Sequence, residues 1–217
     1  MTFATVAGAG AMINWITVGN ADLALFEDWY NFEHLPERVS TPGFRRARRF
    51  RAAGVGAGPA TDFLTVYETD DVDVLSSAAY LAKLDAPTEL TRRVVPLFTE
   101  FRRCAARTTL VHGVGSTGRV LAAELGPAAR LDALRERVPG LVADHRLHVA
   151  SVYEPDAAVS GAKAATAEGR GTAAGPTAGA TVLLEPQTGV GPDDLGLPPD
   201  LALDLREFEL VLELRSH

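Results

Sequence analysis

Tyr30 and His34 stand four residues apart in the stretch DWYNFEHLPERV. On a helix, Leu23, Phe26, Tyr30 and His34 share one stripe, because each is three or four positions from the next. Leucine and phenylalanine favour burial, so this stripe should bring a phenol and an imidazole to the edge of an apolar space. Histidine has an ordinary pKa of about 6.5 and can accept or donate a proton near neutral pH. The spacing therefore predicts His34 as a general base or acid and Tyr30 as its catalytic neighbour.

The same two residues also have a structural interpretation, which stays open. The helix dipole favours a histidine in a last helical turn by about 0.3–1 kcal/mol, and its ring can bond a free carbonyl there. The Tyr30 hydroxyl can simply bond across to a strand. Glu33 points about 100° away from His34 on a helix, so we expect it to influence a site only from a distance.

Three further residues are candidates for binding a ligand. Asn14 and Trp15 lie next to each other on a predicted strand and must point to opposite faces, so only one of them can line a cavity. Asn14 is the better polar contact and Trp15 the better wall. Arg46, like Asn14, could hold a carbonyl or carboxylate of a substrate.

A second apolar stripe of the same helix consists of Leu25, Trp29 and Phe32. A helix covered on one side would not need it, so we expect a neighbouring segment, the second half or another subunit to pack there. Trp29 is accordingly interpreted as structural.

The elements that position these residues follow from apolar periodicity and breaker residues. We expect a strand at Ala11–Gly19 and a helix at Ala21–His34, which ends because Pro36 disfavours helix before it and supplies no donor. The remaining elements of the first half are a turn at Pro42-Gly43 and, by residue number, an extended run at 43–54, a strand at 62–69, a helix at 73–84, a helical turn at 88–93 and a strand at 99–114. The order strand-helix-strand-strand-helix-strand is the ferredoxin-like arrangement.

The second half repeats this order more faintly. Strands are expected at 118–124, 146–154, 180–185 and 206–215, with a helix at 128–138. Glu37-Arg38-Val39 followed by Pro42-Gly43 has an echo in the run from Glu136 to Gly140, which favours a tandem repeat. The predicted fold is α+β, with two ferredoxin-like βαββαβ units, residues 1–114 and 115–217, forming one intramolecular α/β barrel.

Residues 156–180 are dominated by alanine, glycine and threonine. So few large apolar groups offset little of the entropy of ordering, which predicts a flexible surface loop in the second, degenerate unit.

The composition excludes several classes of function. A formal charge of −7 and a pI near 5.2 disfavour a nucleic-acid partner. A single cysteine, Cys104, leaves no intrachain disulfide and no multi-cysteine metal site, and His145 and His148 would point to opposite faces of a strand, so we expect no metal. The chain has neither a basic leader nor an apolar run of about 20 residues, which predicts a cytoplasmic protein without a membrane partner.

FEDWYNFEHLPERVSTPGFRRARRF, followed by YETDDVDVLSSAAYLAKLDAPTELTRRV, resembles the dimeric α/β-barrel superfamily, especially its EthD-like and related uncharacterised actinobacterial members. The resemblance covers about residues 11–110. It implies two ferredoxin-like units in one barrel, with a ligand between one unit's sheet and its helices, near the Tyr30–His34 helix end. In this chain the barrel would be a pseudo-dimer within one polypeptide, with a homodimer as a further option.

The resemblance also implies candidate activities. Relatives include cofactor-free monooxygenases, polyketide cyclases and muconolactone-type isomerases, so we expect a cofactor-independent enzyme that moves protons on a small aromatic or polyketide-like molecule, as an isomerase, cyclase or lyase, or that oxygenates it. The alternative is a non-catalytic small-molecule-binding or assembly protein of the same fold. Haem binding, known in some relatives, is the third interpretation.

Overall fold

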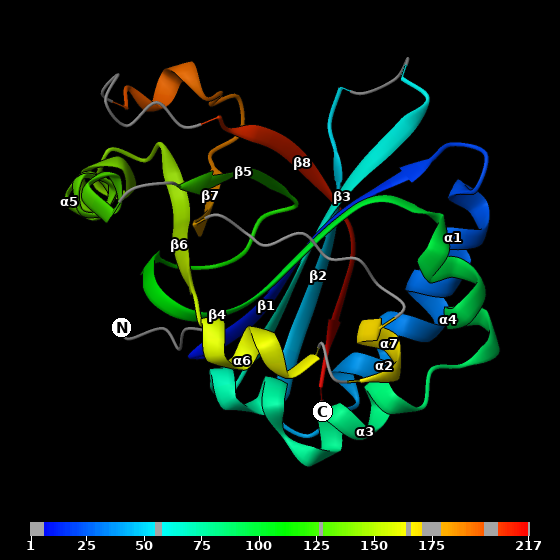
Figure 1. The fold of residues 1–217 in the computed structure, drawn as a ribbon. Helices are drawn as coiled ribbons and strands as arrows, with labels where there is room; N and C mark the ends of the chain where they lie inside the picture. The colour runs from blue at the N-terminus through cyan, green and yellow to red at the C-terminus, as the bar shows by residue number, and fades with distance from the viewer. Residues whose placement is uncertain are drawn as a thin grey trace.

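Eight antiparallel strands close into one barrel, with the helices on its outside (Figure 1). The computed structural model describes residues 7–54, 58–125, 128–163, 166–170, 179–197 and 204–216. Around the barrel the strands follow the order β1-β3-β2-β8-β5-β7-β6-β4, and each neighbouring pair is antiparallel. The predicted α+β barrel of two ferredoxin-like units is confirmed.

The first unit contains β1 (Gly10–Gly19), β2 (Phe44–Ala52), β3 (Ala60–Thr69) and β4 (Phe98–Gly113). Its first crossover holds α1 (Leu23–Trp29), a π-helical turn η1 (Tyr30–His34) and α2 (Leu35–Val39). Its second crossover holds the 3-10 turn η2 (Val72–Ser76), α3 (Ala78–Asp85), α4 (Glu89–Val94) and the 3-10 turn η3 (Val95–Leu97). All of these strands lie close to their predicted positions.

The second unit contains β5 (Arg119–Leu125), β6 (Leu147–Pro155), β7 (Ala180–Pro186) and β8 (Arg206–Arg215). Helix α5 (Ala128–Ala143) follows β5, and a 3-10 turn, η5 (Asp193–Leu195), follows β7. In both units the strands stand in the order fourth, first, third, second, so the two halves share one topology. They join edge to edge, through β2 with β8 and β4 with β6.

The helix that carries Tyr30 and His34 does not end before Pro36, as the sequence predicted, but continues to Val39. Proline lacks an N–H and its ring clashes with the carbonyl four residues earlier. Here the turn before it widens, and the Leu35 N–H donates to the carbonyl of Tyr30, five residues back. This π-type turn accommodates Pro36 inside a continuous helix.

The predicted turn at Pro42-Gly43 is present and its glycine is required. Gly43 has φ +89°, and a Cβ at this position would lie 2.6 Å from Cγ2 of Val74. Both the left-handed backbone and the close side chain favour glycine there. The turn thereby brings the end of α2 against the start of β2.

The described parts of residues 156–180 contain helices within the range that composition predicted to be a flexible surface loop. They include α6 (Ala157–Ala162) and α7 (Ala167–Arg170), while residues 164–165 and 171–178 of the range lie outside the described residues. Helix α7 lies beside the helices of the first unit (Figure 1), and the N–H of Ala167 donates to Asp85 at the end of α3. The second half thus contributes a segment to the helical layer of the first.

Three apolar clusters hold the fold together. One lies between the first unit's sheet and its helices, one between the second unit's sheet and α5, and one inside the barrel. The second cluster is entirely hydrocarbon, rich in leucine and valine. The first contains Tyr30 and lies beside His34, so it is the cluster that borders the candidate catalytic residues.

None of the helices in the described part of the chain combines the length and the apolar character needed to cross a bilayer.

Candidate functional site

A small hollow of about 20 Å³ lies between the sheet of the first unit and its helices. This volume accommodates about one water molecule. Strand β1 supplies Asn14, the widened turn η1 supplies Tyr30 and His34, and the residues that also line the hollow are Met12, Ile16, Trp29, Arg38, Tyr80, Val95, Phe98, Phe101, Arg103, Lys163 and Glu168.

His34 is buried and contacts two aromatic rings, one tilted and one edge-on. Its ring centroid lies 4.4 Å from that of Trp29 and 5.1 Å from that of Tyr30, and the side chain is 6% exposed. Its Nδ1 has no hydrogen-bond partner among the described residues. Burial lowers the pKa of His34 well below 6.5, and Arg38 and Lys163 lower it further while Glu168 opposes them. The imidazole is therefore neutral at neutral pH.

The hydroxyl of Tyr67 holds Tyr30 in position. The Tyr67 hydroxyl donates to the Tyr30 hydroxyl over 3.2 Å, and burial, together with Tyr30 itself, raises the pKa of Tyr67 well above 10. The guanidinium of Arg49 lies 4.8 Å from the centroid of the Tyr30 ring. Since Tyr67 supplies the proton of this contact, the proton of Tyr30 remains available to a ligand.

Asn14 and Trp15 point to opposite faces of β1, as their spacing predicted. Asn14 is 4% exposed and lines the hollow, where its Oδ1 has no hydrogen-bond partner within the described ranges. Trp15 lies in the cluster inside the barrel, with its ring 5.7 Å from that of Phe208. Asn14 therefore belongs to the candidate site, whereas Trp15 does not line it.

Arg46 and Glu33 are engaged elsewhere. Arg46 makes two hydrogen bonds to the buried carboxylate of Glu68, at 2.9 and 2.8 Å, and does not line the hollow. Glu33 accepts hydrogen bonds from Thr88 at 2.5 Å and from Thr91 at 3.3 Å. Arg46 therefore stabilises the pairing of β2 and β3, and Glu33 connects the η1 turn to α4.

The expectation for the second apolar stripe holds only in part. Trp29 is buried and its indole N–H donates to Thr91 over 3.0 Å, yet it also forms a wall of the hollow, so its role is not structural alone. Phe32 is 81% exposed instead of packed. The π-turn changes the direction of side chains after Trp29, which a uniform 100° rotation could not anticipate.

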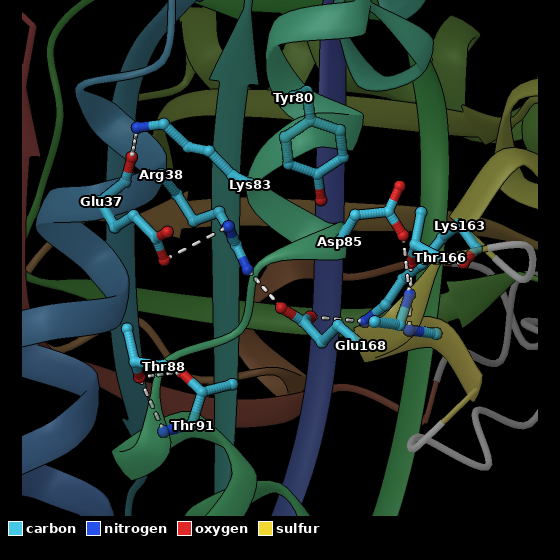
Figure 2. A network of polar contacts seen from close by, with 12 residues as sticks. Glu37, Arg38, Tyr80, Lys83, Asp85, Thr88, Thr91, Lys163, Thr166 and Glu168 are labelled. Atoms are coloured by element: carbon cyan, nitrogen blue, oxygen red, sulfur yellow. Dashed lines mark hydrogen bonds and ion pairs between the residues drawn. The ribbon is translucent and has the colours of Figure 1, made fainter.

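Sequence reasoning missed most of the charged lining. Arg38 lies one helical turn after His34, a spacing of four that continues the Tyr30–His34 stripe and could have revealed it. Glu168 makes a close ion pair with Arg38 and lies 2.9 Å from the Nζ of Lys163 (Figure 2). Both Lys163 and Glu168 come from the stretch that was predicted to be a loop, and nothing in its composition marks them.

Arg103 and Tyr80 complete the polar lining. Arg103 is 8% exposed, and its guanidinium donates to the Tyr80 hydroxyl over 3.4 Å and to the sulfur of Met12 over 3.2 Å. Three cations and one carboxylate therefore line the hollow. Within the described residues, no group of three or more histidine, cysteine, aspartate or glutamate side chains is arranged to hold a metal ion.

The sequence matches no protein-family model and no curated protein. Solved structures share the fold. An anthrone oxidase-like protein has a TM-score of 0.61 at 10% identity, covering 98% of this chain and 96% of that one. A candidate monooxygenase from Fusobacterium nucleatum subsp. nucleatum has a TM-score of 0.57 at 8% identity, with 97% and 96% covered. A candidate monooxygenase from Lactobacillus acidophilus has a TM-score of 0.55 at 7% identity, with 95% and 96% covered.

These identities are low, so the likeness concerns the fold alone. It supports the expected barrel fold across nearly the whole chain. The narrower resemblance to EthD-like members and the origin of the two halves by duplication stay predictions.

Proposed function

We propose that this protein is a cofactor-independent enzyme that removes a proton from a small aromatic or polyketide-like ring, and that its favoured reaction is oxygenation of the resulting anion by O₂. The structural neighbours, an anthrone oxidase-like protein and two candidate monooxygenases, support oxygenation over isomerase, cyclase or lyase chemistry. The observation that carries the proposal is a neutral, buried His34 with an unpartnered Nδ1 at a hollow with excess positive charge.

His34 has the role of general base. Its lowered pKa makes it a weak base in the empty protein, which suits only a substrate with an acidic C–H or O–H. A ring anion in the hollow would counter the positive charge of Arg38 and Lys163, the cations that oppose protonation of the imidazole. Proton transfer therefore becomes more favourable as the anion forms. The protonated imidazole then lies beside a negative charge, whereas without the anion it would face the repulsion of Arg38 and Lys163.

Tyr30 and Asn14 have the role of orienting the ring. The Tyr30 hydroxyl can donate to a developing anionic oxygen, and the Asn14 amide can contact a carbonyl or hydroxyl. For a ring CH₂ group the overall reaction is RCH₂R′ + O₂ → RC(=O)R′ + H₂O, in which the carbon is oxidised and O₂ is reduced. His34 takes the first proton and returns it to the reduced oxygen, so it ends neutral.

One observation favours the alternative of a non-catalytic protein, which either binds a smaller molecule or serves in assembly. A hollow of about 20 Å³ does not accommodate an aromatic ring unless its wall moves. A binding protein would tolerate His34→Gln with little change in function, whereas the enzyme would not. Haem, which is far larger than one ring, finds no support in this volume.

Oxygen uptake with anthrone as the probe tests the proposal. Removing a general base typically costs 10²–10⁴-fold in rate, so His34→Gln is expected to lower the rate by at least about 100-fold. His112→Gln, on β4 and away from the hollow, is the matched control and should keep the wild-type rate. Equal rates in His34→Gln and the wild type would overturn the base role. A wild-type rate no higher than the protein-free rate would overturn oxygenation of this ring class.

A further inference from the structure

The hollow contains a carboxylate that belongs to the protein itself. Glu168 is 8% exposed and lies between Arg38 and Lys163, with an ion pair on each side (Figure 2). Burial would raise the pKa of Glu168, but Lys163 and Arg38 outweigh it and lower the pKa from 4.5 to about 2. The position is therefore built to hold an ionised carboxylate, and a side chain occupies it.

Glu168 also stands between the hollow and the outside. A surface depression of about 130 Å³ between α4 and α7 is lined by Pro87, Thr91, Arg92, Val95, Pro96, Ala167 and Glu168. Val95 and Glu168 line the hollow as well. Because Glu168 lines both spaces, withdrawal of its side chain would free the cation pair and remove one of the side chains that separate the depression from the hollow.

The cations around Glu168 have unused capacity. Nη1 of Arg38 lies 3.4 Å from Glu37 but has no hydrogen-bond partner within the described residues, although the residue is only 1% exposed. Arg103 lines the same hollow. Arginine presents a planar fork that matches two carboxylate oxygens, so a ligand carboxylate could bond Nη1 and Nη2 of Arg38 together, whereas the hydrogen bond from Arg38 to Glu168 uses Nη2.

We propose that the ligand of this site is a ring that bears a carboxylate, and that the carboxylate replaces Glu168 between Arg38 and Lys163. Glu168 is then a built-in competitor whose displacement opens the hollow. This inference rests on the proposed function only in placing the ligand in the same hollow, because it concerns binding and not the reaction.

Calorimetric titration with benzoate, and with benzamide as its neutral analogue, tests the inference. Glu168→Gln removes the competing charge and keeps the side-chain volume, so the Kd for benzoate should fall at least about tenfold while that for benzamide stays constant. Glu154→Gln is the control for net charge, since Glu154 pairs with Arg135 on the second unit. An unchanged Kd for benzoate, or an equal gain for benzamide, would overturn the inference.

Two further variants keep the test decisive if Glu168→Gln does not fold. Glu168→Asp retains the charge on a shorter side chain and should give a smaller gain in benzoate affinity. Lys163→Met in the wild-type background should lower benzoate affinity at least about tenfold, and unchanged affinity in both would again overturn the inference. Benzoate affinity and oxygen uptake are separate measurements, so a failure of the proposed chemistry and a failure of the carboxylate site remain distinguishable.

Discussion

At the scale of single residues, His34 combines two roles that usually exclude each other. It packs as tightly as a core residue, in contact with Trp29 and Tyr30, and it keeps an unpartnered ring nitrogen beside a hollow. A buried polar atom without a partner costs free energy. We expect proteins to retain such atoms where a bound molecule satisfies them, which makes His34 the most informative residue to change.

The lowered pKa of His34 predicts how stability depends on pH. In the folded state the pKa lies well below 6.5, and in the unfolded state it returns to about 6.5. Below pH 6.5 the imidazole is therefore protonated in the unfolded chain but stays neutral in the folded protein. The free energy of unfolding consequently falls as pH falls. From pH 6.5 to 5.5 this one group should remove about 1 kcal/mol.

Urea titrations at the two pH values measure this loss. His34→Gln has no titrating ring, so its loss over the same interval should be smaller than that of the wild type by about 1 kcal/mol. Parallel losses in the two proteins would show that the pKa of His34 is not lowered. Glu168, with its lowered pKa of about 2, affects stability only in a more acidic range.

At the scale of elements, the site depends on α4 holding α1 in place. The hydroxyl of Thr91 accepts the indole N–H of Trp29 over 3.0 Å, in a buried position. Thr91→Val preserves the shape of the side chain but leaves the indole donor without a partner. The expected destabilisation is about 1–3 kcal/mol, measured as a lower free energy of unfolding in urea.

Thr65→Val is the matched control for this prediction. Thr65 is fully buried on β3, and its hydroxyl has no hydrogen-bond partner in the described part of the chain. Replacing it by valine should therefore be neutral or stabilising. A Thr91→Val protein as stable as the control would mean that the Trp29–Thr91 contact does not anchor the two helices.

The sequence predicted the elements better than it predicted their ends and partners. The strands and the shared helix face of Tyr30 and His34 follow from local periodicity, which a single stretch of chain contains. The passage of the helix through Pro36 depends on a widened turn that no apolar pattern signals. Lys163 and Glu168 reach the hollow by long-range packing of α7 on the first unit, and their alanine-rich surroundings indicate only disorder.

At the scale of the whole molecule, buried charges connect the two units inside the barrel. Arg48 of β2 lies 2.5 Å from Glu185 of β7 and 3.4 Å from Glu68 of β3, and all three side chains are nearly inaccessible. Burial, followed by the charge of Glu68, raises the pKa of the neighbouring Tyr153 to about 12, as expected in a dry interior. The barrel is therefore held by an ionic contact across the units as well as by strand pairing.

Glu185→Gln should destabilise the entire protein. It leaves the buried Arg48 with an incomplete set of negative partners, which costs about 3 kcal/mol or more. Because both units share one barrel, unfolding should remain a single transition that shifts to lower urea concentration. The control is Asp70→Asn, in an exposed pair with Arg45, which should change stability little. A wild-type midpoint for Glu185→Gln would show that the interior network contributes nothing net.

The two units are parts of one polypeptide, and this determines the stoichiometry expected for the proposed ligand. A barrel assembled from two identical chains would carry two equivalent chambers, but here the second unit's counterpart is packed with leucine and valine while its α7 segment walls the first. Saturation should therefore occur at one ligand for each 217-residue chain, without cooperativity between halves. The second unit would then supply half of the barrel and, through Glu168 of α7, part of the lining of the hollow in the first unit.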